Sequence, residues 1–256
     1  MSFDTKVAIA ICYKPTEELI KTLESHRFLL PVNAGSTLHT DEWMSKHAKF
    51  DDTGDNISKK NPWYNELTVE YWMWKNMDEI GNPAYVGLNH YRRMFPLDKA
   101  EEWGEADITV AEPITFPGKT LVQQYAGFHN LADLKLCAET IGEVHGPGEG
   151  RFFWTYLDSM VSNFAPRNMF VMKRELFDRW CNFVFPVLFS LEQKIGLDNL
   201  DKRDNYQRRA LGFMAERMFG YWCFGKRLEC TVKTVPAIEN LDYKPPKVNE
   251  RGDWKR

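Results

Sequence analysis

The 256-residue sequence lacks the short motifs that mark several large enzyme classes. It has no G-x-x-x-x-G-K-S/T phosphate loop, no G-x-G-x-x-G dinucleotide fingerprint, no H-E-x-x-H zinc motif and no G-x-S-x-G nucleophile elbow. P-loop phosphoryl transfer, dinucleotide redox chemistry, zinc proteolysis and esterase chemistry therefore lose their usual support.

Long apolar runs and paired cysteines are also missing. Even the run at 183–191, FVFPVLFSL, contains Pro186 and is much shorter than the roughly 20 residues of a membrane-spanning helix. The apolar stretch near the N-terminus is short and no small-residue cleavage site follows it, so it predicts a strand and not an export signal. The five cysteines include no C-x-x-C pair, as is typical of a reducing cytoplasm. We therefore predict a cytoplasmic protein without a membrane span.

Positive charge is scarce in most of the chain and concentrated at its end. The net charge is −3, but residues 167–256 carry 18 Lys/Arg against 12 Asp/Glu, whereas residues 1–166 carry 15 against 24. Such a division steers an anionic ligand toward one face, although an unevenly charged solvated surface is the simpler reading.

Strand-like and helix-like segments alternate along the chain, as in α/β proteins. The apolar run VAIAICYK at 7–14 is typical of a strand buried on both faces of a sheet, and PTEELIKTLES at 15–25 begins with a helix-initiating proline. The pattern also predicts strands at 29–35, 84–91, 106–114 and 168–173, helices at 66–77, 121–144, 151–161, 175–195 and 205–228, a break at 146–150 and a polar loop at 39–61. We predict one domain over residues 1–235 and an extended basic tail over 236–256.

Two polar segments are candidates for binding a phosphorylated sugar. GDNISKKN at 54–61 carries amides and lysines that suit sugar hydroxyls or phosphate, or it is a solvated turn before a helix. NHYRR at 89–93 follows a predicted strand, and ligands of open α/β sheets lie beyond the carboxyl ends of the strands. Its arginines match phosphate oxygens, unless they form surface ion pairs.

Two more candidates lie in the C-terminal third. Asn168 opens a predicted strand, where its amide either binds sugar hydroxyls or caps a turn. Arg209, Phe213 and Glu216 are spaced three to four residues apart and therefore share one helix face, beside Arg217. The alternative is an intrahelical salt bridge against a core stripe.

Five blocks in this order resemble a bacterial glycosyltransferase family that was once catalogued only as a domain of unknown function. The blocks are DDTGDNISKKNPWYNELTVEYWMWKN, YVGLNHYRRMF, ADITVAEP, NMFVMKRELFDRWCNFVFPVL and QRRALGFMAER. The whole resemblance extends from about Val7 to Arg217. The family occurs in capsule and exopolysaccharide gene clusters and includes galactofuranosyltransferases. The resemblance implies one GT-A-like nucleotide-sugar-binding domain, with a mixed, mostly parallel sheet and C-terminal helices.

The sequence departs from many enzymes of that fold because it has no Asp-x-Asp motif for a divalent metal. The strand where the motif is expected ends in NHYRR, so cationic side chains are expected to neutralise the leaving diphosphate. The need for Mn²⁺ or Mg²⁺ stays open. The first strand also ends in Cys12-Tyr13-Lys14, where the family pattern has His-Lys, and Asn89 stands where a smaller or sulfur-bearing residue is usual.

We predict transfer of a hexose, a galactofuranose-like sugar or a pentose from a UDP-sugar to an acceptor hydroxyl, with inversion at the anomeric carbon. The base is expected among Asp55, Glu66 and Glu216. The donor is expected to contact Lys14, Asn56, Lys60, Asn61, His90, Arg92 and Arg93, and the sugar or acceptor to contact Tyr91, Asn168, Arg209 and Arg217.

The sequence is compatible with three interpretations of the acceptor and the activity. The first is a growing surface saccharide. The second is a hydroxymethylated base in duplex DNA, favoured by the basic tail KPPKVNERGDWKR at 244–256. The third is a sugar- or nucleotide-binding module without catalysis.

Overall fold

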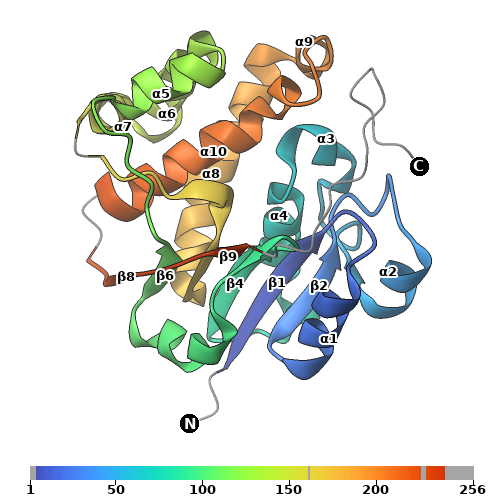
Figure 1. Cartoon of the computed structure of the whole chain (residues 1–256). Coiled ribbons are helices and arrows are strands. Elements are labelled where there is room, and N and C mark those ends of the chain that lie inside the picture. The colour runs from blue at the N-terminus through green and yellow to red at the C-terminus, as the bar shows by residue number, and fades with distance from the viewer. Residues whose placement is uncertain (1–3, 161, 226–228, 240–256) are drawn as a thin grey trace.

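One mixed sheet organises the described residues, which are 4–160, 162–225 and 229–239 of this computed structural model (Figure 1). The sheet has nine strands, of which seven follow the order β3-β2-β1-β4-β7-β6-β8, while β5 pairs with β4 and β9 with β5. The strands are β1 (Thr5–Ile11), β2 (Leu29–Asn33), β3 (Lys49–Phe50), β4 (Tyr85–His90), β5 (Arg93–Met94), β6 (Ile108–Ala111), β7 (Phe170–Lys173), β8 (Val232–Val235) and β9 (Ile238–Glu239).

The strand directions make the sheet mostly parallel, as predicted. β1 is parallel to β2 and β4, β2 to β3, and β6 to β8, whereas β7 is antiparallel to β4 and β6. The chain runs from β1 outward through β2 and β3, then returns to β4 on the other side of β1. This reversal places a topological switch point between β1 and β4, where ligands of open α/β sheets bind.

Helices cover both faces of the sheet. The α-helices are α1 (Glu17–Ser25), α2 (Glu42–His47), α3 (Asn61–Tyr64), α4 (Leu67–Lys75), α5 (Leu121–Phe128), α6 (Leu131–His145), α7 (Pro147–Leu157), α8 (Arg174–Ile195), α9 (Leu197–Asp201) and α10 (Ala210–Gly220). Segments of 3₁₀- or π-helix are η1 (Ser58–Lys60), η2 (Met77–Ile80), η3 (Leu97–Glu105), η4 (Pro166–Asn168), η5 (Gln207–Arg209) and η6 (Tyr221–Gly225). In Figure 1, α5, α6 and α7 lie together beyond α8 and α10, while α1 and α2 lie at the opposite side.

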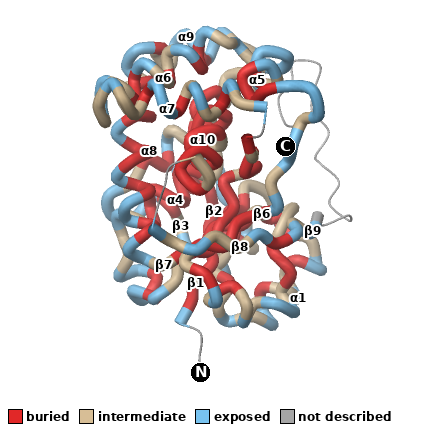
Figure 2. Tube along the Cα trace, turned by 90° about the vertical axis from the view of Figure 1, so that its left-hand side faces the viewer, coloured by how far each residue is buried: buried red, intermediate tan, exposed pale blue. Residues whose placement is uncertain are grey.

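Alternation along β1 divides its side chains between two cores. Val7, Ile9 and Ile11 belong to the core under α1 and α2, while Ala8 and Ala10 belong to the larger core with α4, α8 and α10. Because both faces are covered, the strand has no polar side, which explains its continuous apolar run. Figure 2 shows the buried residues following α8, α10, α4 and the strands through the middle of the molecule.

Several sequence predictions need correction. The segment 39–61 is not one loop: Asp41 caps α2, and β3 extends the sheet edge. The single helix expected at 121–144 is two helices, because Asn130 accepts a hydrogen bond from the Ala132 amide and caps α6. Pro147 begins α7, so the predicted break at 146–150 interrupts the helical structure only at Gly146.

The chain after α8 also differs from the prediction. α9 forms between α8 and α10, and β8 pairs with β6 although the two strands are far apart in the sequence. In the expected tail, Ile238–Glu239 form β9, while residues 240–256, including the basic segment, lie outside the described residues. The domain boundary at 235/236 stays a prediction. No helix in the described part is long and apolar enough to span a membrane, and all five cysteines are free.

Candidate functional site

The switch point between β1 and β4 carries the chain segments 12–14 and 90–93. Ala10 and His90 are register partners, so the residues that follow each strand emerge side by side. Tyr13 and Tyr91 meet edge to face at 5.7 Å, and Lys14 is exposed beside them. Burial raises the pKa of Cys12 to about 11 although its thiol has a hydrogen bond with Tyr91, so the thiol is neutral and unsuited to nucleophilic chemistry.

A strained turn at Arg167 and Asn168 brings β7 to the same edge. These two residues have φ values of 73° and 49°, a left-handed conformation that costs about 1–3 kcal/mol per non-glycine residue. The turn presents the Arg167 carbonyl to His90 Nε2 at 2.6 Å. A carbonyl only accepts hydrogen bonds, so Nε2 carries the proton. Burial lowers the pKa of His90, which makes the ring a neutral imidazole with Nδ1 as an acceptor.

Glu66 precedes α4 at this edge. Its Oε1 accepts a hydrogen bond from Asn168 Nδ2 at 2.8 Å, and no described residue donates to Oε2. Asn168 Oδ1 is itself buried without a hydrogen-bond partner among the described residues. The pair therefore leaves one carboxylate oxygen and one amide oxygen for a ligand.

Glu216 and Arg217 on α10 form a buried ion pair. Glu216 accepts hydrogen bonds from the Arg167 amide at 2.6 Å and from Arg217 Nη1 at 2.9 Å. Arg217 is 2% exposed and also donates to Gln124 at 2.8 Å. Burial raises the pKa of Glu216, with Arg217 opposing and Glu66 adding to the rise. Both Glu216 oxygens are therefore engaged, and the pair holds the Arg167 turn in place.

Arg209 is a cation without a counter-ion in the described part of the chain. Its guanidinium makes no hydrogen bond or ion pair there, and the buried Nε lacks a partner. Its guanidinium lies 5.8 Å from the centre of the Phe213 ring. Its charge lowers the pKa values of both His90 and Glu216, so the guanidinium lies within electrostatic range of these groups. An anion at the switch point would satisfy it.

Asp51 organises the loop that follows β2. Its buried carboxylate accepts five hydrogen bonds, from the backbone amides of Gly35 and Ser36 and from the hydroxyls of Ser36, Ser58 and Thr68. Gly35 has φ 70°, and an added Cβ would lie 2.7 Å from the Cβ of Asn61. One carboxylate thus fastens the end of β2 to η1 and α4.

The 54–61 segment makes protein contacts with most of its polar groups. Asn56 Nδ2 donates to carbonyls of its own loop, and Asn61 Nδ2 donates to the Asn65 carbonyl and Thr68. Lys60 Nζ lies 2.8 Å from both oxygens of Glu192 on α8. Tyr71 donates to the exposed Asp55 carboxylate. A cavity of about 480 Å³ beside Asn56 and Lys60 remains open.

A family model described as a domain of unknown function, DUF4422, matches residues 9–227. The chain belongs to the DUF4422 family. A solved structure described as the apo structure of the bifunctional glycosyltransferase WbbM shares this fold, with a TM-score of 0.73 and 23% identity. The match covers 92% of this chain and 45% of that chain, so the chain spans less than half of that protein. No curated protein sequence matches the chain significantly.

Within this DUF4422 domain, the predicted site residues fall into two groups. One group gathers at the switch point: Lys14, Glu66, His90, Tyr91, Arg92, Arg93, Asn168, Arg209, Glu216 and Arg217. The other group, Asp55, Asn56, Lys60 and Asn61, belongs to the loop held by Asp51 and α8. The donor-binding and catalytic roles of both groups stay predictions.

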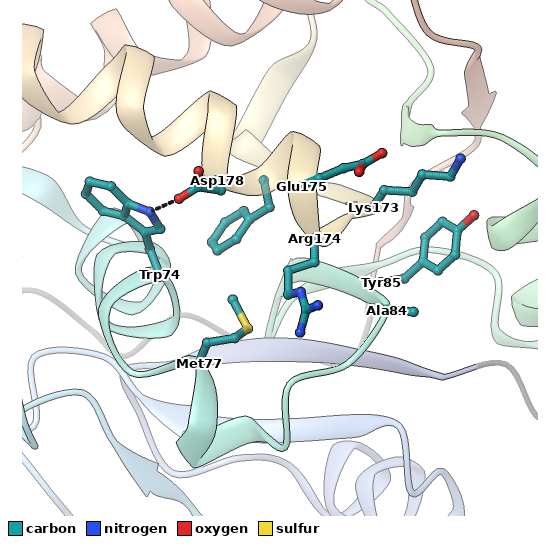
Figure 3. Close-up of a pocket in the computed structure, with 9 residues that line it drawn as sticks. Trp74, Met77, Ala84, Tyr85, Lys173, Arg174, Glu175 and Asp178 are labelled. Atoms are coloured by element: carbon teal, nitrogen blue, oxygen red, sulfur yellow. Dashed lines mark hydrogen bonds between the residues drawn. The ribbon is translucent and has the colours of Figure 1, made fainter.

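The cavity in Figure 3 lies at the opposite edge of the sheet, where β4 begins. It has a volume of about 590 Å³ and opens between Tyr85, which starts β4, and Arg174, which starts α8. Trp74 lines it and donates to Asp178 at 2.8 Å. Lys75 Nζ lies 3.4 Å from the centre of this indole, and the Phe185 ring stacks on it. Because the cavity lies at the start of β4 and the switch point at its end, the two are separate.

Among the described residues, no three His, Cys, Asp or Glu side chains lie together in a group that could hold a metal ion. Glu66 and Glu216 are near each other, but Glu216 is fully used by Arg167 and Arg217. These side chains do not fit a divalent cation held by the protein alone.

Three residues that matter for this geometry were missed in the sequence. Asp51 lies in the supposed loop at 39–61, and its position directly after the short β3 was the available signal. Glu192 accepts a hydrogen bond from Lys60, 132 residues away, and Gln124 accepts one from Arg217, 93 residues away. No local sequence pattern marks either residue.

Proposed function

We propose that the protein is a glycosyltransferase that moves a sugar from a UDP-sugar to an acceptor hydroxyl. The observation that carries the proposal is the unpaired Arg209 guanidinium beside Glu66 and His90 at the switch point of the sheet. A cation without a counter-ion suits a diphosphate, and a carboxylate with a free oxygen suits a base. The fold shared with a glycosyltransferase structure supports the same class.

In the proposed reaction, the acceptor oxygen attacks the anomeric carbon while the bond from that carbon to UDP breaks. Glu66 Oε2 takes the hydroxyl proton, and the Asn168 hydrogen bond holds the carboxylate in place. The departing diphosphate gains negative charge, which Arg209 neutralises with help from Arg92 and Arg93. Attack opposite to UDP inverts the anomeric configuration.

The donor is proposed to carry a hexose, a galactofuranose-like sugar or a pentose, and the acceptor to be a surface saccharide. The alternative of a modified DNA base depends on a basic tail that lies outside the described residues. A binding module without catalysis shares the same donor contacts, so turnover separates it from the transferase.

The test is thermal unfolding of the purified chain with UDP, other nucleotides and a panel of UDP-sugars, with and without Mn²⁺, followed by measurement of UDP release. A ligand that binds only the folded state raises the Tm. We expect UDP or a UDP-sugar to raise it and Arg209→Ala to abolish the rise. Arg179→Ala removes an exposed arginine on α8 and is the matched control. A Tm unchanged by every nucleotide would contradict the donor site.

A further inference from the structure

An exposed aromatic surface lies at the turn between α5 and α6, beside the chain that leads into α10. Phe128 is 65% exposed and Tyr206 is 51% exposed, and the Tyr206 ring stacks on His129 at 5.6 Å with an interplanar angle of 24°. We call Phe128, His129 and Tyr206 the aromatic shelf. Large aromatic side chains gain much from burial, so neighbouring ones left in water indicate a surface that binds something.

The shelf is rigid before any ligand arrives. Asp204 Oδ1 accepts hydrogen bonds from the backbone amides of Tyr206 at 2.8 Å and Gln207 at 2.7 Å. Gln207 Nε2 donates to the Phe128 carbonyl at 2.7 Å, which joins the two segments. Burial, aided by the charge of Arg217, lowers the pKa of His129 to about 4. The stacked ring is therefore uncharged at neutral pH. Because the hydrogen bonds already fix these segments, ligand binding costs little conformational entropy.

The adjoining cavity has the polarity of a site for a neutral ligand. It has a volume of about 450 Å³ and is lined by Phe128, His129, Asn130, Arg203, Asp204 and Gln207. Arg203 is neutralised by two hydrogen bonds to Asp133, at 2.5 and 3.0 Å. Asp204 is then the remaining charge of the lining, so the cavity repels phosphate. Side-chain amides and a carboxylate beside aromatic rings suit a molecule with hydroxyl groups and an apolar face.

The shelf is also next to the proposed reaction site. The Phe213 ring lies 4.1 Å from His129 and 4.8 Å from Tyr206, measured between ring centres. The same ring lies under Arg209, and its backbone carbonyl accepts from Arg217. One side chain thus separates the shelf from the candidate diphosphate cation.

We infer that the aromatic shelf and its cavity form the acceptor subsite and that the acceptor is a saccharide. A sugar ring lays its C–H face on Tyr206 and Phe128, while its hydroxyls reach Gln207 and Asp204. A phosphate-rich acceptor such as duplex DNA does not fit this lining. The inference rests on the proposed function for the meaning of "acceptor", but binding of saccharide to the shelf is testable by itself.

The experiment measures saturation-transfer difference NMR on the full chain with lactose, maltose and methyl α-mannoside as probes. Tyr206→Ala and Phe128→Ala are compared with Phe152→Ala, which removes an equally exposed aromatic (66%) from α7. We expect a signal from at least one probe with the unmodified chain and with Phe152→Ala. We expect it to weaken roughly tenfold in both shelf variants, as for the loss of a central contact. Unchanged thermal unfolding and unchanged UDP binding would show that the variants are folded.

Each outcome bears on one proposal. Saccharide signals that persist in both shelf variants, or the absence of any saccharide signal while UDP binds, would overturn the subsite. Salt-sensitive binding of a duplex oligonucleotide that depends on Tyr206 would overturn the saccharide assignment. Saccharide binding that depends on the shelf, without any nucleotide binding, would support the saccharide site and contradict the proposal of a glycosyltransferase.

Discussion

Replacing Asp51 by alanine is expected to destabilise the protein and to disorder the loop after β2. The carboxylate is fully buried and accepts five hydrogen bonds. Of the three hydroxyls, that of Thr68 has an alternative acceptor, the Asn65 carbonyl. The backbone amides of Gly35 and Ser36 have no such replacement.

The size of the effect follows from these two amides. A buried donor left without a partner costs about 1–3 kcal/mol, so two cost about 4 kcal/mol. In a domain of this length, 1 kcal/mol shifts the Tm by about 2–4 °C, which gives a decrease of roughly 10 °C. Removal of the carboxylate also breaks its hydrogen bonds with the three hydroxyls, so the figure is a lower bound.

The assay is urea and thermal unfolding followed by tryptophan fluorescence, with Asp52→Ala as the matched control. Asp52 is the next residue along the chain, but it is exposed and its carboxylate makes no hydrogen bond among the described residues. The control is expected to unfold within about 0.5 kcal/mol of the unmodified protein. If Asp51→Ala also stayed within that range, the argument from unsatisfied buried amides would be refuted.

Three further predictions address catalysis and pH. Glu66→Gln is expected to lower turnover, measured by UDP release, about 10²- to 10⁴-fold, while UDP binding, measured by thermal shift, is retained. Unchanged turnover would show that another residue is the base. Arg209→Ala is expected to weaken UDP binding at least tenfold in calorimetry, and Arg209→Lys to restore part of it; equal affinities would exclude a diphosphate contact. Burial raises the pKa of Glu70 to about 8, so the stability that its neutral form provides is complete below about pH 4.5 and is lost as the pH rises toward 8. Glu70→Gln keeps an acceptor for the Trp180 indole and is expected to flatten this loss in urea unfolding between pH 5 and pH 9; an identical slope would show that another group causes it.

Local patterns were sufficient where one segment decides its own structure. The apolar run of β1 is buried on both faces, and Thr16 caps α1 by accepting from the Leu19 amide. The polar residues after β4 were expected at a ligand-binding edge, because parallel strands bring their carboxyl ends together. The structure places the ends of β1 and β4 side by side there, with Ala10 opposite His90.

Local patterns failed where distant segments decide. β8 is a four-residue strand whose pairing with β6 joins residues more than 120 positions apart, so its short sequence carries little signal of its own. The segment at 39–61 shows polar composition without periodicity. Its order comes from Asp51, whose partners lie in the turn after β2, on η1 and on α4.

By itself, the sequence determined the class of fold, the order of most strands and helices, and the candidate residues at the end of β4. Those features depend on periodicity and on the chemistry of neighbouring residues, which are local. Only the tertiary structure decided which charged side chains are paired within the protein and which are available to a ligand. Lys60 is paired with Glu192 and Arg217 with Glu216, whereas Arg209 remains unpaired in the described part of the chain. The partner of a charged side chain depends on how helices pack across the core, and the residues next to that side chain in the sequence do not determine this packing.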